Sequence, residues 1–228
     1  MRTMSAAARW ALIASVVAGA SYVVTWRLDL PPALEAGWKG AGVGLLALHA
    51  LLRARGFDGC LLTAALALGA LGDVLLDVAG LTVGAVAFLA GHGVAAWLYL
   101  RHRIPGKALP VLLIPAVAAL SYGLPAERAG AGGIALYATG LATMAAAALL
   151  SDFPWRTVKL GALLFVVSDL LIFARLGPLP DGLLTGLGVW GFYYLGQLLI
   201  CVGVAGTLDE SRATHPQAGY PREGGDPS

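Results

Sequence analysis

Long apolar stretches separated by short polar segments run through most of this chain of 228 residues. A membrane-spanning helix needs about 20 largely apolar residues, with a range of roughly 17 to 25. By that criterion the sequence predicts spans, the second and fifth being the shortest, near 8–26, 38–52, 59–78, 80–100, 108–123, 131–150, 158–175 and 182–206. The predicted fold class is an all-α, polytopic membrane helical bundle with about eight transmembrane helices.

The composition agrees with a membrane protein. Hydrophobic residues make up 58% of the chain and charged residues only 12%, with a mean hydropathy of +0.78, whereas soluble proteins carry about 25% charged residues. Residues 1–206 are expected to form a single transmembrane helical domain. From 207 onward the chain turns polar, with several prolines, glycines and charges, which predicts a disordered C-terminal tail over 207–228.

The sequence lacks the motifs that would indicate several other classes of function. Cys60 and Cys201 both lie in apolar segments and form no CxxC pair, so neither a disulfide framework nor a zinc site is indicated. The net charge of +2 is too small and dispersed to favour nucleic acid, and no phosphate-binding glycine loop occurs. The expected surroundings are membrane lipids, and the oligomeric state is left open.

Basic residues fall mainly on one side of the predicted bundle. With eight spans both termini share a side, and that side collects Arg2, Arg9, Arg53, Arg55, Arg101, Arg103, Lys107, Arg156, Lys159, Arg212 and Arg222. The other side holds Arg27, Lys39, Arg128 and Arg175. The positive-inside rule therefore predicts cytoplasmic termini in a multi-pass protein of the bacterial inner (plasma) membrane.

One alternative concerns the first span. Residues 18–20 (AGA) have the small-x-small form of a signal-peptidase site after an apolar run. Cleavage there would leave seven spans. The apolar run continues past this point to Trp26, which favours a membrane anchor.

Two acidic residues lie inside apolar spans. Asp73 follows Gly72 in the third span, and Asp169 follows Ser168 in the seventh. An unpaired charge at bilayer depth costs at least a few kcal/mol, so such residues need a function or a partner. Each lies about 11 to 13 residues from the cytoplasmic end of its span, which at 1.5 Å per residue gives a similar depth, somewhat past the midplane. The two side chains are therefore expected to face one interior cavity.

The third and seventh spans also indicate an internal repeat. Halving the chain gives four spans plus four running in the same direction, as in parallel-repeat membrane folds. The spans that follow the two acids return from the far side and bring polar residues back toward the same level. These are His92 in the fourth span and Tyr193, Tyr194 and Gln197 in the eighth.

Structural roles remain open for several of these residues. The two central acids could cap a neighbouring helix or pair with a snorkelling arginine. Asp77 lies one turn beyond Asp73 and reads equally well as an interfacial residue or as part of the site. His92 lies between Gly91 and Gly93, where helices can approach closely, so packing and catalysis are both consistent with it.

Three blocks of this sequence resemble the YhhN-like membrane proteins, the lysoplasmalogenase family. They are GDVLL at 72–76, FLAGH at 88–92 with Tyr99 following, and GALLFVVSD at 161–169. The resemblance covers most of the chain from roughly 40 to 205, although Asp77 stands where an apolar residue is expected. It implies hydrolysis of the vinyl ether bond of a lysoplasmalogen, a lysophospholipid substrate, to a fatty aldehyde and a glycerophospho-alcohol.

The residues suit that chemistry independently. Protonation of the β-carbon of a vinyl ether gives an oxocarbenium ion, water adds, and the hemiacetal collapses to aldehyde and alcohol. One protonated acid and one carboxylate can divide this work, as in glycosidases, and no metal or cofactor is needed. Asp73 and Asp169 are the predicted catalytic pair, with neither assigned as the acid because coupled groups titrate jointly.

The remaining predicted site residues would serve the substrate or the attacking water. His92 or a tyrosine hydroxyl would hold water or the phosphate end of the substrate, and Ser168 would hydrogen-bond its neighbouring carboxyl. A proton-coupled small-molecule or lipid transporter would also place acids and a histidine inside the membrane. A non-catalytic lipid-binding protein would need only the packing glycines.

Overall fold

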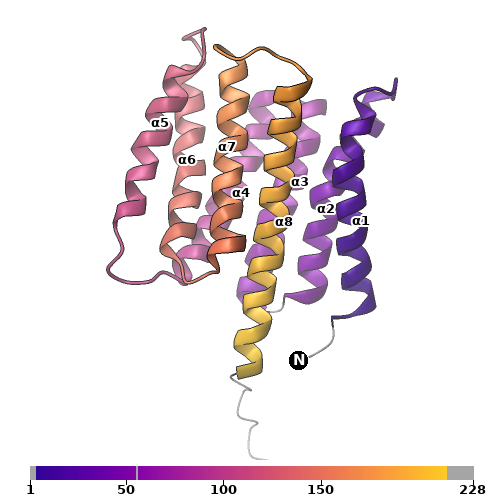
Figure 1. Ribbon diagram of the computed structural model, residues 1–228, viewed down its shortest axis with the longest axis vertical. Helices are drawn as coiled ribbons and strands as arrows, with labels where there is room; N and C mark the ends of the chain where they lie inside the picture. Colours follow the sequence, from indigo (N-terminus) through magenta and orange to yellow (C-terminus); the bar gives the residue numbers. More distant parts are fainter. Residues whose placement is uncertain (1–3, 55, 215–228) are drawn as a thin grey trace, which may run out of the picture.

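The computed structural model describes residues 4–54 and 56–214, and this part of the chain folds as α-helices that run alternately up and down (Figure 1). The helices are α1 (Ala6–Thr25), α2 (Pro32–Arg53), α3 (Gly56–Val78), α4 (Leu81–Arg101), α5 (Leu113–Gly123), α6 (Ala131–Leu150), α7 (Leu160–Arg175) and α8 (Leu183–Thr214). A 3-10 turn, Leu109–Leu112, precedes α5, and a π-helical turn, Trp155–Lys159, precedes α7. The start of α1 and the end of α8 lie at the same end of the bundle, here called the terminal end.

The prediction of an all-helical fold is confirmed, whereas the number of membrane spans stays a prediction. Among the described residues, six helices are long and apolar enough to cross a membrane: α1, α3, α4, α6, α7 with its preceding turn, and α8. The helix α5 has only 11 residues. The helix α2 is long enough at 22 residues, but its composition keeps it outside that group.

The helix α2 begins earlier than the predicted span 38–52. Pro32 occupies the first helical turn, where its fixed φ suits a helix start and its missing N–H has no intrahelical acceptor to lose. Glu35 in the same turn complements the positive end of the helix dipole. These are helix-start signals in a polar segment, so a search for apolar residues passes over them.

The helix α8 continues to Thr214, past the boundary at 206 that the apolar pattern predicts. Arg53, at the end of α2, donates a hydrogen bond from Nε to Asp209 Oδ2 at 2.7 Å. This ion pair joins the polar extension of α8 to α2, and residues 207–214 are helical where the sequence predicted a disordered tail. The rest of the predicted tail, 215–228, lies outside the described residues.

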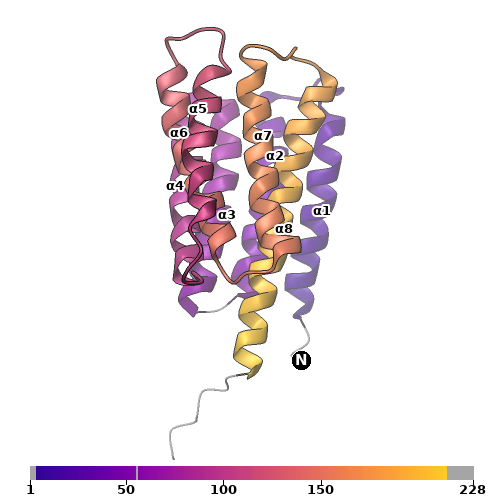
Figure 2. The same cartoon turned by 60° about the vertical axis from the view of Figure 1, so that its left-hand side comes forward.

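The helices divide into a central group and a peripheral pair (Figures 1 and 2). The helices α2, α3 and α4 pack in sequence, α8 lies against α2, α3 and α7, and α6 lies against α4. The helix α5 packs on the outer side of α6, and α1 packs along α2. Buried side chains from α2, α3, α4, α6, α7 and α8 therefore share one core.

Small residues set the closest of these contacts. A Cβ added to Gly161 of α7 would lie 2.7 Å from the carbonyl oxygen of Gly196 in α8, and one added to Gly196 would lie 2.8 Å from the carbonyl of Gly161. Paired glycines of this kind let two helix backbones approach directly, as in membrane helix packing generally. This glycine contact brings the backbones of α7 and α8 together at the level of the bundle where polar residues of both helices face inward.

Equivalent packing of the two halves is not seen, and the predicted four-plus-four repeat stays a prediction. The helix α2 packs along α3, whereas the matching helices α6 and α7 contact each other much less. The helix α6 instead packs against α4 of the first half. This cross-contact matters for the site, because it brings a tyrosine of α6 toward the acid of α7.

Candidate active site

Asp73 lies inside the bundle on α3, and its side chain is turned away from the outer surface. The residue is 2% exposed, and its Oδ2 accepts a hydrogen bond of 2.6 Å from the hydroxyl of Tyr193 on α8. The preceding Gly72 is required by packing, because a Cβ there would overlap the ring of Phe88 on α4. The sequence pair Gly-Asp thus places the carboxyl beside a close helix contact.

Asp169 occupies a comparable position on α7. It is 5% exposed, and its Oδ2 accepts a 2.7 Å hydrogen bond from the hydroxyl of Tyr137 on α6. The same hydroxyl lies 3.1 Å from Nε2 of His92 on α4. Since Tyr137 donates its proton to the carboxyl, the His92 nitrogen is the donor to the tyrosine oxygen, which fixes the imidazole tautomer.

An aromatic layer joins the two acids. The ring of Phe165 on α7 lies 5.1 Å from that of Tyr193 and 4.9 Å from that of His92, centroid to centroid. Phe88 closes the same layer, 5.8 Å from Tyr193. Five helices, α3, α4, α6, α7 and α8, therefore converge on one interior site.

We call each acid, together with the side chains hydrogen-bonded to it in sequence, a branch of the site. Gln197 extends the Asp73 branch. It lies one turn after Tyr193 on α8 and is 5% exposed, and its Nε2 and the Tyr193 hydroxyl both approach Gly69 of α3. In each branch the carboxyl contacts a tyrosine hydroxyl, and a side chain with a nitrogen donor lies beyond that tyrosine. This side chain is Gln197 on the Asp73 branch and His92 on the Asp169 branch.

Asp77 lies one helical turn from Asp73, toward the end of the bundle opposite the terminal end. It forms an ion pair with Lys39 of α2, with Nζ and Oδ1 2.9 Å apart. The side chain of Asp77 is 33% exposed and that of Lys39 15% exposed. The pair places one cation and one anion at the outer edge of the site.

Two predicted site residues turn to other partners. Ser168 donates from Oγ to the carbonyl oxygen of Val189 on α8 at 2.9 Å, and not to the neighbouring carboxyl as expected. The hydroxyl of Tyr194 lies 2.9 Å from Oγ of Ser15 on α1. Adjacent helix positions point about 100° apart, so Tyr193 and Tyr194 cannot both reach Asp73.

The sequence reasoning missed Tyr137 and Lys39. Tyr137 is the aromatic residue of an Ala-rich and Gly-rich helix, a signal that could have been read as a polar group placed among small packing residues. Lys39 lies in the glycine-rich first half of α2, a segment that the predicted span only just included. Its pairing with Asp77 depends on the rotation of α2 against α3.

The arrangement is suited to proton transfer. Within residues 4–54 and 56–214, neither central carboxyl forms an ion pair, and no cluster of three His, Cys, Asp or Glu side chains could hold a metal ion. Two buried carboxylic acids that share one interior site can divide into a proton donor and a proton acceptor. One acid and one carboxylate are the components of general acid and base catalysis.

Comparison with known proteins gives one match. The model of the YhhN family matches residues 34–204, which run from α2 into α8 and include both central acids, Tyr137 and Tyr193. No curated protein and no solved structure matches the chain.

Proposed function

Because the chain belongs to the YhhN family, we propose that it is a membrane hydrolase of the lysoplasmalogenase type. Its reaction would be cleavage of the vinyl ether bond of lysoplasmalogen-type lysolipids, giving a fatty aldehyde and a glycerophospho-alcohol. The proposal assigns the chemistry to Asp73 and Asp169 and uses no cofactor.

The observation that carries the proposal is the pair of buried carboxyls, each held by a tyrosine from another helix. A structural acid inside a bundle needs only one satisfied partner. Here two acids are gathered by five helices around one aromatic layer. That is the arrangement that an acid-labile bond requires.

The reaction then follows in three steps. One acid donates its proton to the β-carbon of the vinyl ether, and the electron pair of the double bond forms the new C–H bond. The resulting oxocarbenium ion is stabilised by the other carboxylate, which also accepts a proton from the water that adds to the cationic carbon. As the C–O bond of the hemiacetal to the glycerol breaks, the carboxyl that took up the proton of the water gives it to the departing glycerol oxygen. The first acid, now a carboxylate, takes the hydroxyl proton of the hemiacetal, which gives alcohol and aldehyde and restores both original protonation states.

The outer ion pair suits the polar end of such a substrate. In a lysoplasmalogen the vinyl ether and the phosphate are separated by the three-carbon glycerol unit, a length of about one helical turn, 5.4 Å. Lys39 and Asp77 lie one turn from Asp73. The proposal therefore orients the phosphate toward Lys39, with the alkenyl chain entering the apolar interior.

The test is hydrolysis by the purified protein in detergent, with aldehyde release measured for three matched lysolipids. The 1-alkenyl compound should react, whereas its 1-alkyl analogue has no double bond to protonate and should not. A 1-acyl analogue tests for an ordinary esterase. In D2O the aldehyde, trapped at once by reduction, should carry one deuterium on the carbon next to the carbonyl. Equal turnover of the alkyl and alkenyl compounds would exclude this mechanism.

The same assay separates the proposal from a transporter. A carrier would release no aldehyde in detergent and would act only across a sealed bilayer. Uptake or efflux in vesicles together with absent hydrolysis would therefore assign the two acids to proton coupling.

A further inference from the structure

A small cavity lies between the two carboxyls and the terminal end of the bundle. Its volume is ≈ 30 Å³, and a water molecule needs roughly 10 to 15 Å³ of such volume. It is enclosed by side chains of α3, α4, α6, α7 and α8, the same helices that build the acid site. Most of its wall is apolar, but three polar side chains reach it: His92, Tyr99 and Gln197.

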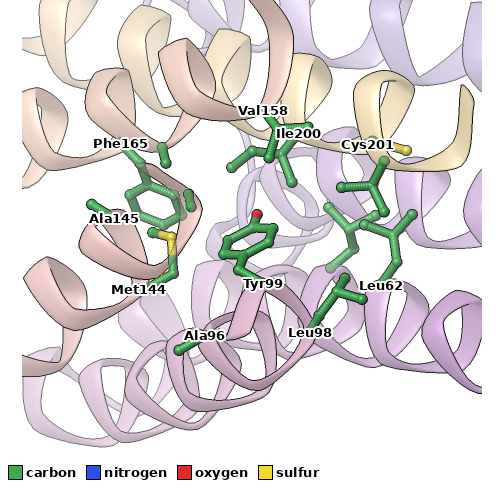
Figure 3. Packing of buried hydrophobic residues seen from close by; sticks show 14 of the residues in the cluster. Leu62, Ala96, Leu98, Tyr99, Met144, Ala145, Val158, Phe165, Ile200 and Cys201 are labelled. Carbon is green, nitrogen blue, oxygen red and sulfur yellow. The ribbon is translucent and has the colours of Figure 1, made fainter. Parts of the chain in front are cut away.

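Tyr99 is the unexplained member of this group. It is fully buried, with 0% exposure, and its hydroxyl has no hydrogen-bond partner among the described residues. Figure 3 shows the hydroxyl pointing from α4 toward Ile200 and Val158, surrounded by hydrocarbon side chains. A buried hydroxyl without a partner is costly, and a bound water is the usual way in which such a group is satisfied.

The other two polar residues connect the cavity to both acids. His92 is bonded to Tyr137, which is bonded to Asp169. Gln197 approaches Gly69 of α3 beside the hydroxyl of Tyr193, which is bonded to Asp73. The cavity wall thus includes the last polar residue of each branch, together with Tyr99, whose hydroxyl has no partner among the described residues.

We propose that this cavity holds the hydrolytic water and that Tyr99 is a positioning residue that orients it, together with Gln197 and His92. The inference rests on the proposed function and deepens it. A buried water needs two to four polar partners, and these three side chains supply them. The water adds its oxygen to the cationic carbon and gives its proton to the carboxylate, so the step needs no other reactant. The cavity stores water on the side away from the Lys39–Asp77 pair, where it does not compete with the incoming lipid.

The test is Tyr99→Phe in the full-length protein, which removes one oxygen and leaves the ring. We expect kcat for aldehyde release to fall about tenfold, the scale of one lost hydrogen bond to the attacking water, with KM unchanged. Melting temperature gives a second readout. A hydroxyl that holds a water stabilises the fold, so its loss should lower the melting temperature, whereas removal of a hydroxyl in a dry cavity should leave it unchanged or raise it.

The matched control is Tyr122→Phe on α5, a residue that is exposed on the bundle surface. It should change neither quantity. A second variant, Ala95→Val, narrows the cavity, because Ala95 lies in its wall, and should lower kcat by displacing the water. Wild-type kcat in Tyr99→Phe would overturn the proposal.

Failure of the inference can be told from failure of the proposed function. If the wild-type protein releases no aldehyde, the hydrolase proposal fails, and the melting temperature of Tyr99→Phe still decides whether the cavity is wet. A fall then supports the water site, and an unchanged or higher value overturns it.

Discussion

The two acid branches use the same first partner, a tyrosine hydroxyl, and differ in the charged groups that lie near it. Asp73 and Asp169 each accept one tyrosine hydroxyl within the short range 2.6–2.7 Å. On the Asp169 branch, the imidazole of His92 lies beyond Tyr137. Among the described residues, no cation forms an ion pair with Asp169. Beside Asp73 lies Lys39, one turn away and already paired with Asp77.

This difference divides the site into an inner and an outer half. The Asp169 branch is enclosed by α4, α6 and α7, and its hydrogen bonds among the described residues run through Tyr137 to His92. The Asp73 branch adjoins the one ion pair near the site, and that pair is partly exposed. A substrate with a charged end and an apolar chain would meet the Asp73 branch first. We therefore expect both branches to contribute equally to the chemical step and the Asp73 branch to contribute more to substrate binding.

The largest effect is expected for the acids themselves. Asp73→Asn or Asp169→Asn keeps the side-chain shape and removes the titratable proton, so each should lower kcat by about 10² to 10⁴. The double variant should be little worse than either single one, because residues that act as a unit are not additive. Asp181→Asn, in an exposed loop where the aspartate pairs with Arg175, is the control. Near-normal turnover in either single variant would show that the pair is structural.

A smaller loss is expected from the tyrosines. Tyr137→Phe and Tyr193→Phe each remove one hydrogen bond to a carboxyl, an interaction of about 1.5 to 3 kcal/mol. Loss of about ten- to hundredfold in kcat should follow in both if the branches are chemically equal. Tyr194→Phe removes the hydroxyl bonded to Ser15 and is the matched control, with kcat kept. A loss in only one of the two branch variants would break the symmetry.

His92→Ala tests whether the deeper branch has a role beyond packing. If the imidazole acts through Tyr137 and the water cavity, kcat should fall by about tenfold, the worth of one hydrogen bond, while the melting temperature changes little. If it serves only packing against Phe165, kcat and melting temperature should fall together. A variant with full activity and full stability would remove the histidine from the site.

The smallest effect is expected at the outer ion pair. Exposed pairs contribute about 0 to 1 kcal/mol to stability, so Asp77→Asn should be tolerated with a small loss. Lys39→Gln should raise KM by a fewfold and leave kcat near the wild-type value, because it touches only the polar end of the substrate. Comparing KM for a lysolipid with and without its phosphate in both proteins isolates that contact. A fall in kcat with unchanged KM would place Lys39 in the chemistry instead.

The sequence by itself determined the all-helical class of the protein and marked its two buried acids. Long apolar runs fix where helices lie along the chain, and α3, α4 and α6 begin and end close to the predicted spans. The cost of a buried charge marks Asp73 and Asp169 as residues that need an explanation. Counting residues along each helix then brings His92, Tyr193 and Gln197 to the same level, since helical rise is constant.

Only the tertiary structure decided which of these residues meet. The choice of Tyr193 over Tyr194, and of Tyr137 over Ser168, depends on how each helix is rotated about its axis and which helix lies beside it. In a membrane, both the lipid-facing and the core-facing sides of a helix are apolar, so the apolar pattern carries little information about rotation. The same limit hid the unpartnered hydroxyl of Tyr99, which becomes visible only when the five helices that enclose it are placed together.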